Sequence, residues 1–403
     1  MRIKLIGLGA AGNKAAICAV ENEILPMEDV MLINSTLKDI PADYKGKSNC
    51  HEFMNSYGGC GKERSLSFEL CENSLKNDIF GFTQFLAAET SEEAELVIVV
   101  ASTEGGTGSG AAPLIANFIN KVYGIPVHIY GLAGFEDDVR GMRNTVDFFK
   151  EMDEGFTVEC TKNSKFLDST GNKFKAEKEA NVEFCKKISV LAGLQLRDCE
   201  HNIDPTDLLK LSTTEGYMII EYALIDSKIK NKEQFKQALI SAIDNSKAMD
   251  PGAANQKRLG VIINIREESM DFIDYYDTLI ERFGTPYEKY EHIQHEANMP
   301  EFIAFIAAGL TLPTEEVENV YNNYEKTMQK VSTDNSASFF DTIRSKNVTD
   351  KDSMFEHHGK KKETVSKADF FKNAQSASAT NSGFSGTKVG VEIKEKKNAL
   401  DSY

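Results

Sequence analysis

Residues 104–110 (EGGTGSG) contain the residue types that hold a phosphate group. Glycines and hydroxyl residues are interleaved in this segment, at Gly105, Gly106, Thr107, Gly108, Ser109 and Gly110. Glycines let consecutive backbone N–H groups converge on an anion, and Thr and Ser hydroxyls add further donors. The apolar run 96–100 (LVIVV) precedes the segment, and helical sequence follows it at 111–123. A glycine-rich turn between a buried strand and a helix predicts a phosphate-binding site.

A second glycine-rich segment, GLGAAGN at residues 7–13, follows the apolar run 3–6. Its candidate ligand contacts are Gly9, Ala10, Ala11, Gly12 and Asn13. The G-x-G-x-x-G spacing also occurs in Rossmann-type NAD-dependent oxidoreductases, which need an acidic residue at the end of the second strand; this chain has Asn34 there. Residues 61–63 (GKE) lack the Ser or Thr of a Walker A motif. Asn34 therefore weakens the Rossmann oxidoreductase hypothesis, which is kept only as the alternative from another functional class.

Short apolar runs alternate with helical sequence in the first half of the chain. The runs are residues 3–6, 30–33, 96–100 and 127–132, and helical stretches follow at 13–22 and 111–123. Continuously apolar strands separated by helices are typical of a parallel sheet that is covered on both faces. The expected fold class is α/β.

The second half predicts a long helix and a smaller α+β unit. The expected helices are 177–195, 206–227, 233–245 and a segment within 270–283, and the expected strands are 258–265, 287–295 and 302–309. We divide the chain into a nucleotide-binding domain at 1–175, a connecting helix at 176–200, a second domain at 201–330 and a disordered tail at 331–403. The tail is rich in Ser, Asn, Thr, Lys and Gly and shows no sustained apolar period.

Composition limits the classes of function. The 403 residues carry a formal charge of −16, which argues against a general binder of nucleic acid or anionic membranes. Residues 331–403 hold 12 Lys and Arg against 10 Asp and Glu, a net charge of +2. The seven cysteines show no CxxC pair and fit reduced thiols. Without a signal peptide or an apolar run of about 20 residues, the expected location is the cytoplasm.

The glycine segment is similar to the signature of tubulin and its bacterial homologue FtsZ. That family carries GGGTGTG followed by small residues and proline, and this chain has GGTGSGAAP at residues 105–113. The resemblance implies a GTP- or GDP-binding protein that uses Mg²⁺. It assigns the remaining nucleotide contacts to Asn34, Gly58, Gly59, Gly61, Asp138, Arg143, Asn163 and Asn181, the last two reading guanine. Glu104 stands where the family has the leading glycine of this motif. The substitution is unexpected, because a carboxylate beside a phosphate site should repel the ligand.

Residues 202–207 (NIDPTD) match the NxDxxD segment of the same family. There the segment enters the nucleotide pocket of the next subunit, which implies catalytic roles for Asn202, Asp204 and Asp207. Phosphoryl transfer to water requires mainly positioning and charge stabilisation, so a carboxylate that orients a water molecule suits the reaction. The simpler interpretation is that Asp204 caps a helix that begins near Pro205. Both interpretations can hold together.

The resemblance implies a filament-forming GTPase whose partner is itself, in a head-to-tail homopolymer. The preferred role is a TubZ-type filament that moves plasmid or phage DNA, with an adaptor on the tail linking it to DNA or membrane. A divergent cell-division FtsZ is the alternative. The sequence ends in KEKKNALDSY, without the DxPxFLR-like peptide of division proteins. His292 and His295 are spaced i,i+3 on an expected strand without a nearby third ligand, so no protein metal site is expected.

Overall fold

The computed structural model describes residues 1–87, 93–152, 155–199, 202–225, 231–252, 255–266 and 273–345, with side chains up to residue 330. Met1–Ala337 form one compact unit, and the chain from Ser338 belongs to another. The strands are β1 Ile3–Leu8, β2 Val30–Asn34, β3 Cys50–Glu52, β4 Leu96–Ser102, β5 Val127–Ala133, β6 Thr157–Lys162, β7 Gly216–Leu224, β8 Arg258–Asn264, β9 Glu288–Gln294 and β10 Phe302–Leu310. The helices are α1 Gly9–Glu21, α2 Ala42–Lys45, α3 Arg64–Lys76, α4 Phe82–Phe85, α5 Gly106–Tyr123, α6 Val139–Lys150, α7 Lys173–Leu191, α8 Pro205–Ser212, α9 Lys232–Asp244, α10 Tyr276–Phe283 and α11 Thr314–Ser345.

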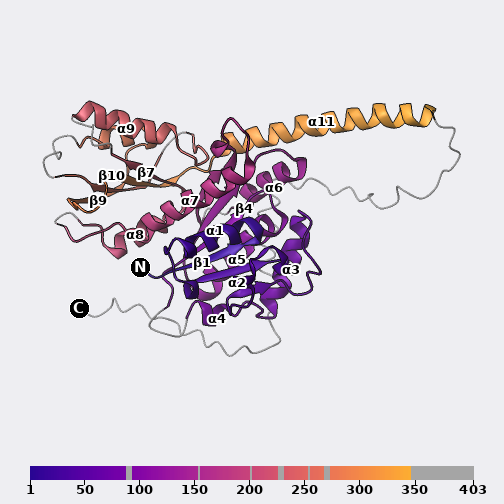
Figure 1. The fold of residues 1–403 in the computed structure, drawn as a ribbon, viewed down its shortest axis with the longest axis horizontal. Coiled ribbons are helices and arrows are strands. Elements are labelled where there is room, and N and C mark those ends of the chain that lie inside the picture. The colour runs from indigo at the N-terminus through magenta and orange to yellow at the C-terminus, as the bar shows by residue number, and fades with distance from the viewer. Residues whose placement is uncertain are drawn as a thin grey trace. The chain divides into compact units, whose positions relative to one another are not determined.

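In the described part of the chain, ten strands form a single sheet in the order β3-β2-β1-β4-β5-β6-β7-β10-β8-β9. Strands β1 to β6 pair in parallel, β10 is antiparallel to both β7 and β8, and β9 is parallel to β8. Helices pack on both faces, with α3 and α5 against one and α1 and α7 against the other (Figure 1). Every residue of β2, β5 and β10 is buried, as expected for strands covered on both sides. The predicted α/β class is confirmed.

One predicted element is wrong. Residues 206–227 do not form one helix, because α8 ends at Ser212 and the strand β7 begins at Gly216. The helical backbone stops at the C-cap residue Thr213, and Gly216, with φ +116°, is the first residue of the strand. The apolar run that follows is buried between neighbouring strands, and such a run cannot be told from a buried helix by periodicity alone.

Helices α1 and α5 begin earlier than predicted. Sequence patterns placed their starts at residues 13 and 111, but they begin at Gly9 and Gly106. Glycine has a low helix propensity, so the sequence did not indicate that these turns are helical. The glycine segments are therefore largely the first turns of helices.

The predicted domain boundaries stay a prediction, because the sheet runs without interruption from the first domain into the second. The boundary at 330/331 falls inside α11, which continues to Ser345. The remainder of the predicted tail, residues 346–403, lies outside the described residues. None of the helices in the described stretches is long and apolar enough to cross a membrane.

A buried ion network joins α7 to the middle of the sheet. The β6–β7 ladder is short, with register pairs at Thr157 and Val158. Lys187 of α7 lies under this junction, with its side chain 1% exposed, and its Nζ is 2.7 Å from Glu159 of β6 and 3.7 Å from Glu221 of β7. Burial raises the pKa of Glu159 to about 7 against the opposing effect of the ammonium group. One cation therefore bridges the two halves of the sheet.

Replacing Lys187 with Met should destabilise the fold by about 3–5 kcal/mol, because two buried carboxylates lose the ammonium group with which both pair. Urea denaturation followed by circular dichroism measures this loss. The matched control is Lys186→Met, whose side chain is 56% exposed and pairs only with Glu183 at 3.7 Å; we expect a change below about 0.5 kcal/mol. Equal stability of the two variants would contradict the bridging role.

Candidate nucleotide-binding site

The predicted ligand residues gather at one edge of the sheet. Strands β1, β2, β4, β5 and β6 are parallel neighbours in the described sheet, so their carboxyl ends lie at the same edge. Chain order reverses direction between β1 and β4, and ligands of open α/β sheets bind at such a switch point. The two glycine segments directly follow these two strands.

Two uncapped helix N-termini meet at the switch point. Leu8 precedes α1 and Gly105 precedes α5, and neither helix start receives a side-chain hydrogen bond from its N-cap residue. Helices α6, α7, α8 and α9 instead have Asp or Asn caps. A Cβ on Gly9, which has φ +73°, would lie 3.0 Å from the Gly108 nitrogen. The two helix starts thus bring N–H groups without a side-chain cap close together, an arrangement that suits an anion.

Close backbone contacts explain the glycines. A Cβ on Gly12 would overlap the carbonyl oxygen of Val100, and one on Gly106 would lie 2.6 Å from the backbone of Lys62. Ala10 and Ala11 complete the first turn between Gly9 and Asn13. A larger residue at Gly12 would push α1 away from β4, and one at Gly106 would push α5 away from the loop that precedes α3. The site is a cradle fixed by packing.

Three predicted contacts carry a buried polar atom without a hydrogen-bond partner in the described chain: Asn13 Oδ1, Asn34 Nδ2 and Asn163 Oδ1. The residues are 2%, 2% and 8% exposed. Buried amide atoms are normally bonded, so unpaired atoms indicate a ligand or ordered water. All three residues lie at the same edge of the sheet, at the start of α1 or the ends of β2 and β6. The residues present therefore fit a polar ligand.

The segment after β2 joins the cradle. Ser35 Oγ lies 2.7 Å from Thr107 Oγ1 in the first turn of α5. Gly59 faces the same place, since a Cβ there would lie 3.9 Å from Ser35 Oγ. Gly58, Gly59 and Gly61 have φ values of +115°, +120° and +53°. Gly59 thus lies near Ser35, and the predicted roles of Gly58, Gly59 and Gly61 as nucleotide contacts stay a prediction.

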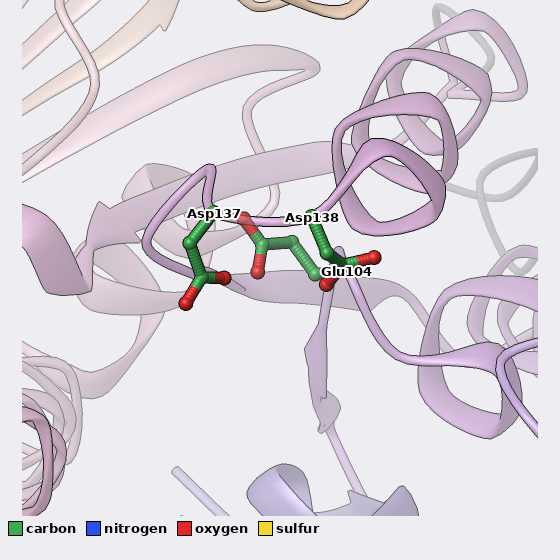
Figure 2. Close-up of side chains that lie close together, drawn as sticks. All are labelled: Glu104, Asp137 and Asp138. Atoms are coloured by element: carbon green, nitrogen blue, oxygen red, sulfur yellow. The ribbon is translucent and has the colours of Figure 1, made fainter. Parts of the chain in front are cut away.

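The structure explains Glu104. Its carboxylate points to the loop between β5 and α6, where Oε1 accepts a hydrogen bond from the Glu136 backbone N–H at 2.9 Å. Asp137 and Asp138 lie close to it (Figure 2), with carboxylate oxygens of all three within 4.8 Å of one another. Lys173 pairs with Asp137 and Lys62 with Asp138. Burial, opposed by the backbone hydrogen bonds, raises the pKa of Glu104. Glu104 therefore holds a loop and does not face the phosphate cradle.

The side chains of Asp138 and Arg143 contact residues outside the two glycine segments. Asp138 caps α6 by accepting a hydrogen bond from the Gly141 N–H at 2.8 Å. Arg143 pairs with Asp147 at 2.8 Å and lies over the ring of Tyr324 of α11, 5.9 Å from its centroid. The structure thus places Asp138 at the rim of the site and turns Arg143 toward α11.

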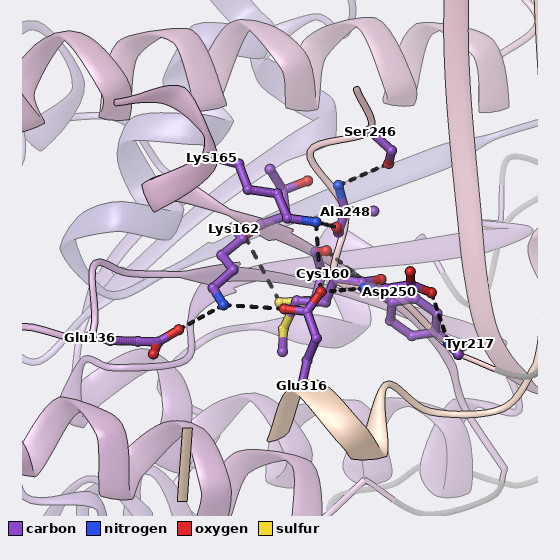
Figure 3. Close-up of polar contacts among 12 residues, drawn as sticks. Glu136, Cys160, Lys162, Lys165, Tyr217, Ser246, Ala248, Asp250 and Glu316 are labelled. Atoms are coloured by element: carbon purple, nitrogen blue, oxygen red, sulfur yellow. Dashed lines mark hydrogen bonds and ion pairs between the residues drawn. The ribbon is translucent and has the colours of Figure 1, made fainter. Parts of the chain in front are cut away.

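Asn163 directly follows β6, in a turn that a polar network fixes. Lys162 Nζ lies 2.8 Å from Glu136 and 3.2 Å from Glu316 of α11, and Lys165 Nζ is 3.6 Å from Glu316 (Figure 3). Single lysines carry no sequence signature, so this network was not predicted. It connects the turn of Asn163 to the loop that Glu104 holds.

Asn181 lies half-buried on α7. Four residues before it, Glu177 pairs with Lys14 of α1 at 3.4 Å. Residues four apart share a helix face, so this face of α7 is turned to α1. Asn181 is therefore placed on the side of α7 that faces the first glycine segment.

Asn202, Asp204 and Asp207 lie elsewhere. Helix α7 follows the carboxyl end of β6 and its 19 residues span about 28 Å. Gly193, just beyond it, contacts Leu208 of α8. The chain then enters β7, whose first residue bonds to Phe156 before β6. The segment 202–207 therefore lies at the amino edge of the strands, opposite the glycine cradle (Figure 1).

Asp204 and Asp207 form a capping box at the start of α8. Asp204 Oδ1 accepts a hydrogen bond from the Asp207 N–H at 2.8 Å, and Asp207 Oδ2 accepts one from the Asp204 N–H at 3.4 Å. Asn202 and Asp204 are exposed and Asp207 is partly exposed. The predicted helix cap is thus present, and the carboxylates remain on the surface.

The curated proteins that are similar in sequence to this chain are tubulin-like proteins and FtsZ proteins. No protein-family model matches the chain. It is 23% identical over 279 residues to the tubulin-like protein CetZ3 of Haloferax volcanii, covering 65% of this chain and 69% of the relative. It is 25% identical to the tubulin-like protein TubZ of Clostridium botulinum C phage, over 54% of this chain and 57% of the relative. It is 24% identical to cell division protein FtsZ 1 of Pyrococcus horikoshii, over 68% and 72%.

Solved structures share the fold. The Clostridium botulinum phage c-st TubZ superposes with a TM-score of 0.64 at 16% identity, covering 81% of this chain and 98% of that one. A GTPγS-bound protofilament of Haloferax volcanii CetZ2 gives 0.64 at 18% identity, with 81% and 100% covered. The TubZ-Bt two-stranded filament gives 0.68 at 16% identity, with 87% and 94% covered.

Fold and site define an α/β protein with a phosphate cradle between two glycine-lined helix N-termini. In sequence and in fold, the chain is similar to proteins of the tubulin/FtsZ superfamily. The Rossmann oxidoreductase alternative has no support among these relatives.

Gly134 tests the role assigned to Glu104, because a Cβ on Gly134 would overlap the Glu104 carboxylate. Gly134→Ala alone should lower the free energy of unfolding by about 1–3 kcal/mol, because the added Cβ displaces the Glu104 carboxylate from its backbone donors. When Glu104 is already replaced by Ala, Gly134→Ala should lower the free energy of unfolding only slightly. A double-mutant cycle measured by urea denaturation should therefore give a coupling energy of about 1–2 kcal/mol. Additive effects would show that Glu104 does not hold this loop.

Proposed function

We propose that this protein is a filament-forming GTPase that converts GTP to GDP and phosphate where two subunits meet. The observation that carries the proposal is the separation of the two halves of the site. The glycine cradle lies at β1 and β4, whereas α8 packs against β8 and β10. Four strand spacings separate β4 from β10, which is about 19 Å. Asp207 can reach a cradle only on a second copy of the chain.

The described residues suit a guanine nucleotide. The N-termini of α1 and α5 would hold the phosphates, with Thr107 and Ser109 in the first turns of α5. Asn163 and Asn181 would face the base, each offering an amide donor and acceptor. Asn13 and Asn34, with their unpaired buried atoms, would bind between these ends. Mg²⁺ is expected with the phosphates.

Bound GTP supplies the γ-phosphoryl group and, with Mg²⁺, the charge that the reaction redistributes. Asp207 of the adjoining subunit would orient the attacking water and accept its proton. Asp204 holds Asp207 in place through the capping box and adds a second exposed carboxylate. Asn202 contributes an amide at the entrance of the same segment. Relatives crystallised as GTPγS protofilaments support head-to-tail assembly.

Asp207→Asn should retain nucleotide binding and assembly but slow hydrolysis by about 100-fold or more. Asparagine keeps an oxygen that accepts from the Asp204 N–H, so the capping box remains while the charge is removed. Phosphate release above the assembly concentration measures turnover, and light scattering measures assembly. Long-lived filaments are the expected result.

The matched control is Asp277→Asn, which removes an exposed acidic residue from the first turn of α10. It should leave turnover unchanged. Turnover per subunit of the unmodified protein should rise with protein concentration, since the site requires two chains. Concentration-independent turnover, or a normal rate in Asp207→Asn, would contradict the shared site.

For the biological role we propose a TubZ-type filament that segregates plasmid or phage DNA through an adaptor. The TM-score of 0.68 with the TubZ-Bt filament, against 0.57 with an FtsZ dimer of M. jannaschii, supports this role over cell division. TubZ structures give TM-scores of 0.64–0.68, and CetZ structures give 0.60–0.64. A divergent FtsZ remains the alternative.

Deleting residues 346–403, which begin directly after α11, tests the role of the tail. The truncated protein should keep GTPase activity and assembly, because the cradle and residues 202–207 remain. It should lose its effect on plasmid inheritance, measured as the rate of plasmid loss in cells that depend on this protein for segregation. Unchanged plasmid inheritance would argue against an adaptor on the tail, and a division defect would favour the FtsZ alternative.

A further inference from the structure

The segment 202–207 is exposed, yet its catalytic role would require a fixed shape. The capping box fixes its carboxyl-terminal side. On the other side, Ile203 is 2% exposed and packs in the core beside α7 and β10. Its backbone N–H donates a hydrogen bond to His292 Nδ1 of β9 at 3.4 Å. One buried imidazole thus holds the residue between Asn202 and Asp204.

His292 is fixed by a chain of side-chain and backbone bonds. Its Nε2 lies 2.8 Å from Gln294 Oε1, which also accepts a bond from the Arg197 backbone N–H at 2.9 Å. Gln294 Nε2 donates to the Gln195 carbonyl oxygen at 3.0 Å. These bonds tie β9 to the segment that follows α7.

The bonds also determine the tautomer. The Arg197 N–H can only donate, so the Gln294 atom it meets is the oxygen, and His292 Nε2 must carry the proton that points to that oxygen. Nδ1 is then unprotonated and accepts from Ile203. Burial lowers the pKa of His292, although the hydrogen bond to Gln294 acts in the opposite direction. The lowered pKa favours the neutral imidazole. The imidazole is 0% exposed.

We propose that His292 is a positioning residue for the catalytic segment, holding Asn202 and Asp204 in register through its Nδ1···H–N bond to Ile203. The inference rests on the proposed function, since it concerns the same segment. A core position in β9 that needed only packing would suit an aliphatic residue. An imidazole there supplies a buried acceptor for a buried N–H, and losing it leaves that donor unpaired.

Three substitutions of His292 distinguish a role as hydrogen-bond acceptor from a role in packing alone. His292→Asn can place its Oδ1 near the position of Nδ1, whereas His292→Gln places its carbonyl nearer to Nε2, and His292→Leu offers no acceptor. We expect turnover of the assembled full-length protein to fall about 10- to 100-fold in the Leu and Gln variants, because small displacements of catalytic groups have such effects. The Asn variant should stay within about threefold of the unmodified protein.

Measurements that do not depend on turnover should be unchanged in the His292 variants. Nucleotide affinity and the assembly concentration should be the same in all three variants, so the effect falls on turnover alone. Hydrogen exchange at the Ile203 amide should be slow in the unmodified and Asn proteins and fast in the Gln and Leu proteins. His295→Leu, whose ring bonds the Ile265 carbonyl, is the control with unchanged turnover.

The Asn and Gln variants carry the decisive comparison if His292→Leu fails to fold, because both are polar and differ in where the carbonyl lies. Equal turnover of these two variants, or normal turnover in His292→Leu, would overturn the inference. The Asp207→Asn result keeps the two proposals apart. Slow Asp207→Asn with normal His292 variants would reject only the positioning role, whereas normal Asp207→Asn would reject the shared site itself.

Discussion

The polarity of the parallel sheet is the constraint on which the rest of the structure depends. Strands that run the same way place all their carboxyl ends at one edge, and the helices that follow them begin there. The N–H groups of α1 and α5 therefore converge at that edge, where the unpaired atoms of Asn13, Asn34 and Asn163 also lie. Helix α7 must run back to the opposite edge before the chain enters β7, so the segment 202–207 has to lie there. In the proposed function, two complementary half-sites on opposite edges would give a heterologous contact, which builds a filament where the rotation between subunits does not close into a ring.

This arrangement requires α7 to keep a fixed register against the sheet. An apolar helix face could slide on an apolar sheet with little change in buried area, whereas a buried cation can satisfy its carboxylates in only one position. Lys187 meets Glu159 and Glu221 on two adjacent strands, at the junction where their own ladder is shortest. Asn181 lies on the same helix and residues 202–207 follow its far end, so the ion network acts on the helix that links the two predicted parts of the site. Its contribution is to register, since a buried ion pair adds little net stability.

The sequence predicted the parts whose signals are local. Glycines at close backbone approaches, short apolar strands and the NIDPTD segment were found because each is contiguous in the chain. It missed β7, because an apolar run buried on both faces has no period of its own. It left Glu104 unexplained, because its partner is a backbone N–H 32 residues away. It treated His292 only as a poor zinc ligand, because the residue's role depends on a contact 89 positions distant. The separation of residues 202–207 from the glycine segments follows from the order of the strands in the sheet, which no single motif encodes.

The capping box shows how one pair of carboxylates can serve both structure and chemistry. Asp204 uses Oδ1 for the Asp207 N–H, and Asp207 uses Oδ2 for the Asp204 N–H, so each residue orients the other. The remaining oxygen of Asp207 lies 3.7 Å from Lys210, on the partly exposed side of α8. That oxygen is held in direction by the bonds that its partner makes, without a further residue to position it. A helix cap and a water-orienting carboxylate are therefore compatible demands. The cap supplies the rigidity that a residue acting in another subunit's pocket would need.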